Sequence, residues 1–217
     1  MPTTERTTVR SLVTLPAGWL PVVVASGSGA ALLGLASAWI GLVTAGVTPG
    51  GSEVARWTVG GPISAVEGAI WFLFDAHWVR IRTGPGLGTT IFGRPLVQAD
   101  AALWPLRGVV AVIGVAGAGA VRYLGTTDPL TGAVTGAGTA LGYLPTMLAL
   151  RWISRVPLTR HAADGAVPIS DADGIPVSQA TGVSAGPDLV AALVLVTGLS
   201  VTVGGLAGAA AAVAAGD

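Results

Sequence analysis

Long stretches without charge alternate with short stretches rich in charge, glycine and proline. Residues 11–52, 129–150 and 189–216 contain no Asp, Glu, Lys, Arg or His. Each of these stretches exceeds the roughly 20 apolar residues that cross a bilayer as a helix. The pattern therefore predicts an all-α fold, a polytopic bundle of transmembrane helices.

The chain holds five candidate spans, and one of them is ambiguous. The four clear spans are Trp19–Thr44, Trp104–Tyr123, Leu130–Trp152 and Leu189–Ala212. The ambiguous segment, Trp57–Trp78, carries Glu67 near its centre. A charged side chain there raises the free energy of insertion by about 2.5 to 3.5 kcal/mol. The alternatives are five spans, or four spans plus an interfacial or re-entrant helix.

The aromatic residues favour five spans. Trp and Tyr gather where the bilayer meets water, and three pairs lie about 30 Å apart at a helical rise of 1.5 Å per residue. The pairs are Trp19 with Trp39, Trp57 with Trp78, and Trp104 with Tyr123. Because the second pair brackets the ambiguous segment, we expect that segment to span as well.

The distribution of arginine predicts the orientation. All eleven basic residues are Arg. With five spans and a cytoplasmic N-terminus, nine of them lie in the cytoplasm and two, Arg56 and Arg122, lie outside. Four spans with an external N-terminus divide them eight to three, so both arrangements obey the positive-inside rule. The aromatic spacing favours a multi-pass protein of the cell membrane with a cytoplasmic N-terminus.

Composition excludes several classes of function. Hydrophobic residues make up 52% of the chain and charged residues 10%, against about 25% charged in soluble domains. A net charge of zero leaves no basic surface for nucleic acid. Without Cys or Lys there are no disulfides, thiolate metal sites or phosphate-loop lysine. We expect no metal, no cofactor and no covalent catalysis, and we expect the lipid bilayer as a partner.

The chain is predicted to be a single membrane domain over residues 1–217. Residues 1–18 form an N-terminal tail. Residues 79–102 and 153–187 form polar, turn-rich loops that are too short for a second domain.

Glu67 is the candidate residue for ion or proton transport. If residues 57–78 are helical, Glu67 lies about 15 Å from either interface, at the bilayer midplane. An ionisable side chain at that depth indicates a proton carrier, an ion ligand or a wet cavity. The alternative is a protonated carboxyl that hydrogen-bonds Ser37, Thr135 or Tyr143 and serves only packing.

The stretch "WFLFDAHWVR", residues 71–80, raises the question of a metal or catalytic site. On a helix, Asp75 and His77 point about 200° apart and cannot share an ion. No spacing to other acids matches a known ligand pattern. We expect Asp75, His77 and Arg80 to be interfacial residues that meet water where the chain leaves the membrane.

Small residues recur at four-residue spacing in the clear spans. Membrane helices associate through such residues because they let backbones approach closely. The candidate packing residues are Gly34, Gly132, Gly136, Gly204 and Gly208. Pro145 is expected to kink the span Leu130–Trp152.

The sequence "GVSAG", residues 182–186, matches the G-x-S-x-G pattern of serine nucleophiles. That pattern requires a strand before the serine and a histidine partner. No strand pattern precedes Ser184, and both histidines, His77 and His161, lie at the inner edge or in a loop. We therefore interpret Asp188 or Ser184 as the helix-start residue, and an intramembrane hydrolase is the least favoured function.

Three stretches resemble a family of small polytopic membrane proteins of halophilic archaea. They are "GAIWFLFDAHWV", "GYLPTMLAL" and "LSVTVGGLAGAAAA". The family carries a similar W-x-F-x-N-A-H-F-V stretch, and this chain departs from it by having Asp75 in place of the amide and Trp78 in place of Phe. The resemblance covers most of the chain and implies a membrane bundle without a characterised activity.

Two classes of function follow. The first is transport or permeation of a small solute or ion, with Glu67 as the carrier residue and Pro145 as a flexible point. The second is a structural or assembly subunit whose glycine-rich faces bind another membrane protein or a second copy of the chain. A polar cavity around Glu67 would favour transport, and a dry contact with one Ser, Thr or Tyr would favour packing.

Overall fold

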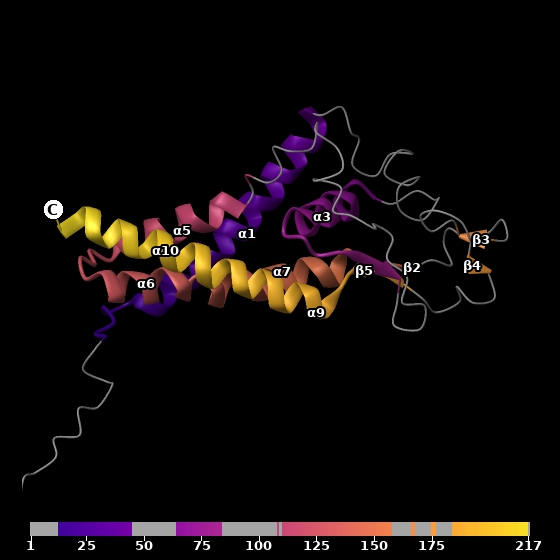
Figure 1. Ribbon diagram of the computed structural model, residues 1–217. Helices are drawn as coiled ribbons and strands as arrows, with labels where there is room; N and C mark the ends of the chain where they lie inside the picture. Colours follow the sequence, from indigo (N-terminus) through magenta and orange to yellow (C-terminus); the bar gives the residue numbers. More distant parts are fainter. Residues whose placement is uncertain are drawn as a thin grey trace, which may run out of the picture.

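The fold is seen in a computed structural model that describes residues 13–44, 64–83, 108, 110–157, 166–167, 175–176 and 184–216. Most of these residues are helical (Figure 1). The helices are α1 (Trp19–Thr44), α3 (Ala65–Ala76), α5 (Ala111–Tyr123), α6 (Pro129–Gly138), α7 (Ala140–Ile153), α9 (Leu189–Ala191) and α10 (Thr197–Gly216). A π-helical segment, Ala192–Val196, joins α9 to α10. The predicted all-α bundle is confirmed.

Three helical segments are long and apolar enough to cross a membrane. They are α1, the α6–α7 pair over Pro129–Ile153, and the run from α9 to α10 over Leu189–Gly216. Helix α5 is apolar but only 13 residues long in the described part of the chain. These helices fit a membrane location.

Helix α1 and the α6–α7 pair lie side by side and run in the same direction. The indole of Trp19 covers Gly138, and further along α1 the backbone at Gly27 meets Tyr143. Helix α1 was expected to pack through Gly34, which is buried. Gly27 makes a close backbone approach, because a Cβ there would overlap the Thr139 carbonyl.

Helices α6 and α10 run in opposite directions and meet backbone to backbone. Gly132 lies against Gly208, and Gly136 lies against Gly204. A Cβ on any of these four glycines would approach the facing helix more closely than real Cβ atoms do. The contact therefore depends on the missing side chains, as expected where membrane helices associate through small residues.

The two ends of the bundle can be named by one residue each. At the Asp128 end, Thr14 and Pro16 lie beside the turn 124–128 that joins α5 to α6. The last residue of α10, Gly216, also reaches Thr127 of this turn. The opposite end, where α3 lies, is the His77 end (Figure 1).

Residues 64–83 stay at the His77 end. Leu42 near the end of α1 and Ile113 near the start of α5 belong to one buried cluster with α3. The described part of the connection between α1 and α5 thus packs against α1 near its end. Twelve residues also span only about 18 Å, against about 30 Å of hydrocarbon. The described part of the ambiguous segment, residues 64–78, therefore fits the alternative, a short helix at one end of the bundle, and residues 57–63 lie outside the described residues.

Short strands close the His77 end. Strands β1 (Ile81–Thr83), β5 (Ser184–Pro187) and β2 (Val156–Pro157) form an antiparallel sheet in the order β1-β5-β2. Strands β3 (Ala166–Val167) and β4 (Ile175–Pro176) form a separate pair. Strands of two to four residues are too short to give an alternating pattern, so the sequence indicated only loops here.

The break in the predicted span Leu130–Trp152 lies at Thr139, between α6 and α7. Its amide donates to the Gly136 carbonyl three residues back, at 3.2 Å, which tightens the turn. Pro145, the expected site of the kink, lies inside α7, six residues after Thr139.

Candidate functional site

Glu67 lies in the first turn of α3. Ser64 has an extended backbone, with φ −68° and ψ 153°, so the helix begins at Ala65. The Glu67 amide donates to the Ser64 hydroxyl at 3.2 Å, and the Ser64 amide donates to the Glu67 carboxylate at 2.8 Å. This reciprocal pair is a capping box. The inference that Glu67 sits halfway along a spanning helix is therefore wrong.

The C-terminal end of α3 is a Schellman motif with an unusual residue. Trp78 has φ 59°, in the left-handed region where glycine is common. Its amide donates to the Asp75 carbonyl at 2.9 Å, and the Val79 amide donates to the Phe74 carbonyl at 3.0 Å. Phe74 and Val79 are both buried, as the hydrophobic contact of this motif requires. The motif turns the chain from α3 towards β1.

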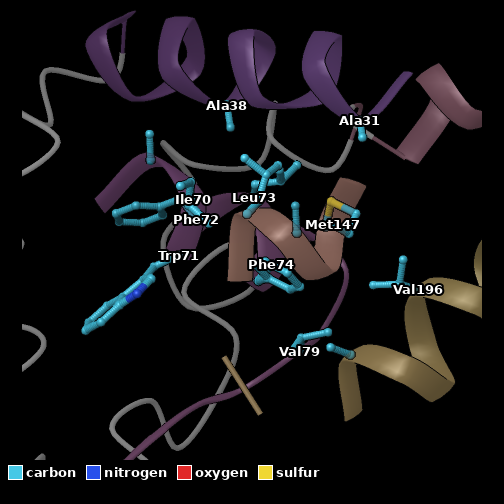
Figure 2. Close-up of a cluster of buried hydrophobic side chains, with 14 of the residues drawn as sticks. Ala31, Ala38, Ile70, Trp71, Phe72, Leu73, Phe74, Val79, Met147 and Val196 are labelled. Atoms are coloured by element: carbon cyan, nitrogen blue, oxygen red, sulfur yellow. The ribbon is translucent and has the colours of Figure 1, made fainter. Parts of the chain in front are cut away.

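The side chains of α3 fill the core of the His77 end. Figure 2 shows the run from Ile70 to Phe74 between Ala31 and Ala38 of α1, Met147 of α7 and Val196. Every residue from Gly68 to His77 is buried. Helix α3 is therefore enclosed all round, which explains why its sequence is apolar without forming a span.

Trp71 ties α3 to the end of α7. Its indole Nε1 donates to the Ser154 carbonyl at 2.8 Å, and both residues are buried. Ser154 is the C-cap of α7, where backbone carbonyls lack helical partners. This hydrogen bond thus satisfies two polar groups that would otherwise be buried without partners.

His77 ties the end of α3 to the first turn of α7. Its Nδ1 lies 2.7 Å from the Leu73 carbonyl, and its Nε2 lies 2.7 Å from the Tyr143 hydroxyl. A carbonyl only accepts, so Nδ1 carries the proton and the neutral ring accepts from Tyr143 through Nε2. His77 belongs to none of the helices long enough to cross a membrane. Burial lowers the pKa of His77 from 6.5 to about 4, opposed by the hydrogen bond to Leu73.

Asp75 and His77 do not meet water at a membrane exit. Asp75 is 1% exposed and His77 is fully buried, so the structure places both inside the protein, while Arg80 is exposed. Within the described residues, no group of three His, Asp or Glu could hold a metal ion. His161 lies outside the described residues.

Ser184 begins β5 and contacts a guanidinium. Arg155 donates to the Ser184 hydroxyl from Nη2 at 2.7 Å and from Nε at 3.2 Å. Asp188 follows the strand and caps α9, accepting from the Ala191 amide at 2.7 Å. The helix-start role expected of this segment is thus filled by Asp188.

A row of buried hydroxyls, which the sequence interpretation missed, runs along one side of α6 and α7. Thr131, Thr135, Thr139 and Tyr143 are four residues apart and all buried; we call them the hydroxyl row. Residues at i and i+4 share a helix face. The Tyr143 end of the row contacts His77 at 2.7 Å. The row therefore links the region of the Asp128 end to the core of the His77 end.

Thr135 is the exceptional member of the row. Within the described part of the chain, its buried Oγ1 has no hydrogen-bond partner. By contrast, the hydroxyls of Thr139 and Ser200 donate to carbonyls three or four residues back, at 2.7 and 2.5 Å. Such back-bonding is the usual way to satisfy a hydroxyl in a membrane helix. The Thr135 hydroxyl makes no such bond to a carbonyl of its own helix.

The row begins at a polar pocket at the Asp128 end. Thr131 donates to the Asp128 carboxylate from its hydroxyl at 2.6 Å and from its amide at 2.7 Å. Both bonds lower the pKa of Asp128, and the bond from the Thr131 hydroxyl has the larger effect. The carboxylate is therefore ionised at neutral pH. The pocket has a volume of about 370 Å³ and is lined by Thr14, Pro16, Leu124, Gly125, Thr126, Thr127, Asp128 and Thr131. Thr126 is 7% exposed, and its Oγ1 also has no partner among the described groups.

Comparison with known proteins gives a family. The model of a family of unknown function (DUF7978) matches residues 6–215. No curated protein and no solved structure matches the chain. The chain belongs to the DUF7978 family, whose description assigns no activity.

Proposed function

We propose that this member of the DUF7978 family is a multi-pass membrane protein that lets a small solute or ion permeate, without covalent catalysis. The observation that supports this proposal is the hydroxyl row, a line of polar groups inside a bundle of apolar helices. The row takes the role that was first expected of Glu67, which serves as a helix cap instead.

The energetics of the row favour a functional role over a structural one. A buried hydroxyl without a partner destabilises a protein by about 1 to 3 kcal/mol. The chain carries two such groups, Thr126 and Thr135, among the described residues. Valine has nearly the same shape as threonine and would avoid this cost. A protein that served only as a scaffold would gain nothing from keeping these hydroxyls.

The proposed orientation follows from four crossings. In this arrangement α1 and α5 are the two crossings that precede the turn 124–128. The N-terminus and this turn therefore face the same side of the membrane. The arginines then divide eight to three in favour of the His77 end. The positive-inside rule assigns the His77 end to the cytoplasm and the N-terminus to the outside. This orientation replaces the cytoplasmic N-terminus that five spans would require.

A structural or assembly role is the second candidate. The capping box places Glu67 at the start of a helix, a structural role that favours packing. The backbone contact of α6 with α10 gives a rigid bundle with large apolar residues exposed on its outer faces. In this case the partner would be another membrane protein or a second copy of the chain.

A flux assay tests the leading proposal. The purified protein is reconstituted into lipid vesicles, and the permeation of protons, potassium ions and glycerol is compared with that of protein-free vesicles. We expect at least one of the three to permeate faster, and Thr135→Val to reduce that flux. Three fluxes equal to those of protein-free vesicles would contradict permeation and favour the assembly role.

A further inference from the structure

We propose that Arg151 and Arg155 bind the phosphate of an anionic phospholipid at the His77 end of the bundle. The lipid lies along the end of α7, with its headgroup against β5. This inference goes beyond the permeation proposed above and does not depend on it.

The two arginines lie where a spanning helix reaches the membrane surface. Arg151 is in the last turn of α7, which ends the membrane-long segment Pro129–Ile153, and Arg155 follows that end by two residues. Beside them, Trp152 is 74% exposed and Ile153 is 55% exposed. Tryptophan is enriched at the level of the lipid headgroups. The end of α7 therefore places positive charge next to apolar surface at the depth of the lipid phosphates.

Strand β5 holds both guanidinium groups in place. Arg151 donates from Nε to the Pro187 carbonyl at 2.8 Å. Arg155 donates from Nε and Nη2 to the Ser184 hydroxyl. The Arg155 side chain also lies over Gly186, because a Cβ on this glycine would be 3.4 Å from the arginine Cγ. An arginine that is already held loses less conformational entropy when it binds a ligand.

The contacts with β5 leave most of the arginine donors for another acceptor. A guanidinium has five N–H donors, and these contacts use one of Arg151 and two of Arg155. Within the part of the chain that the structure describes, the other donors remain for a ligand. Phosphate suits them because a guanidinium can form parallel hydrogen bonds with two phosphate oxygens.

The charge around β5 also favours an anion. The two acceptors on the strand are a carbonyl and a hydroxyl, both neutral, so the bonds to them leave the positive charges in place. Asp188 and Arg155 both lie close enough to Arg151 to act on its charge. Arg80 is exposed on the other side of Asp188, whose amide donates to its carbonyl at 2.9 Å. The described arginines thus outnumber the carboxylate, and this surface is positive.

A phospholipid fits this surface better than a free phosphate ion. Exposed residues on α7 recur at helical spacing and form an apolar face that ends beside the arginines; they are Leu141, Pro145, Ala149 and Trp152. Acyl chains can lie along this face while the phosphate meets the guanidinium groups. A zwitterionic lipid is disfavoured because its own ammonium group offsets the phosphate charge. The cytoplasmic leaflet, which the proposed orientation assigns to this end, carries anionic lipids.

The test measures the affinity of the full-length protein in detergent for phosphatidylglycerol and for phosphatidylcholine with the same acyl chains, by native mass spectrometry. Each basic residue near an anionic lipid surface contributes about a fivefold gain in affinity. We therefore expect the wild type to bind phosphatidylglycerol at least about tenfold more tightly than phosphatidylcholine. Arg155→Gln should lower the affinity for phosphatidylglycerol about fivefold and leave that for phosphatidylcholine unchanged. Arg122→Gln is the matched control, because Arg122 is exposed at the Asp128 end, and it should change neither affinity.

A second variant separates lipid binding from a structural role. Arg155→Lys keeps the charge and should retain most of the preference for phosphatidylglycerol. Without lipid, the melting temperature of Arg155→Gln should equal that of the wild type, because the side chain is exposed. Arg155→Lys that loses both the preference and thermal stability would show that Arg155 only supports the fold, and would overturn the proposal.

The remaining outcomes are equally decisive. Equal affinity of the wild type for the two lipids would overturn the proposal. A preference that Arg155→Gln and Arg151→Gln both leave unchanged, or that Arg122→Gln reduces as much, would also overturn it. Excess inorganic phosphate should leave phosphatidylglycerol bound; displacement of the lipid would assign the arginines to a free phosphate ion instead. Flux measurements bear on the permeation proposal alone, so either proposal can fail while the other stands.

Discussion

The two ends of the bundle are built by opposite means. Towards the Asp128 end, α6 and α10 touch through glycines, and the contact exists because side chains are absent. At the His77 end, α3 inserts large side chains such as Trp71 and Phe74, and hydrogen bonds from Trp71 and His77 hold it to α7 and its C-cap. We therefore expect added side-chain atoms to destabilise the contact of α6 with α10. We expect the loss of side-chain atoms to destabilise the core around α3.

The largest effect is expected at Trp71. Trp71→Ala leaves a cavity in the core of the His77 end and strips the Ser154 carbonyl of its partner. Large-to-small core substitutions of this kind lower the free energy of unfolding by about 3 to 5 kcal/mol. Thermal unfolding in detergent measures the change. Trp152→Ala is the control, since Trp152 is 74% exposed; equal losses in both variants would mean that α3 is not the core of this end.

The His77 end should also respond to pH. The pKa of His77 is lowered from 6.5 to about 4, so between these values the unfolded chain takes up a proton that the folded protein does not. Stability therefore falls as the pH drops from 6.5 to 4, by up to about 3 kcal/mol. The melting temperature of the wild type should decline over this window more steeply than that of His77→Gln. Parallel curves would show that His77 is not buried as a neutral ring.

Gly136 tests the opposite kind of packing. Gly136→Ala places a Cβ on the backbone of Gly204 and should lower the free energy of unfolding by about 1 to 3 kcal/mol. Gly119→Ala is the matched control, because nothing lies within 4 Å of a Cβ there. Alanine is the better helix former, so the control should be neutral or slightly stabilising. A harmless Gly136→Ala would contradict the close contact.

The smallest effect is expected at the cap of α3. Ser64→Ala should lower stability by about 1 kcal/mol, as for other lost N-caps. Glu67→Gln should change neither stability nor flux, because glutamine also completes a capping box. Loss of flux in Glu67→Gln, with the fold intact, would return the carrier role to Glu67.

The sequence predicted the bundle well and the place of Glu67 badly, for physical reasons. Long uncharged stretches identify spanning helices whatever their neighbours are. The depth of Glu67 instead depended on where its helix begins, and the spacing Ser64-x-x-Glu67 is itself a helix-start signature that contradicts a helix through both residues. The tryptophan spacing was misleading because Trp78 closes a short buried helix rather than a span.

The candidate site could be predicted only in part. The four-residue spacing of Thr131, Thr135 and Thr139 is visible in the sequence, but their burial is not. Which hydroxyl bonds a carbonyl and which does not is decided by side-chain rotation in the packed bundle. The pairing of His77 with Tyr143 joins residues 66 positions apart and needed the fold.

Single cysteines test directly how the two ends of the bundle lie across the membrane, because the chain has no cysteine of its own. Thr14→Cys, Thr127→Cys and Arg80→Cys are labelled in intact cells with a membrane-impermeant maleimide. Four crossings predict that Thr14→Cys and Thr127→Cys react from outside, and that Arg80→Cys reacts only after the cells are permeabilised. Protection of Thr14→Cys while Thr127→Cys reacts would mean an odd number of crossings between them and would contradict the placement of α3 at one end of the bundle.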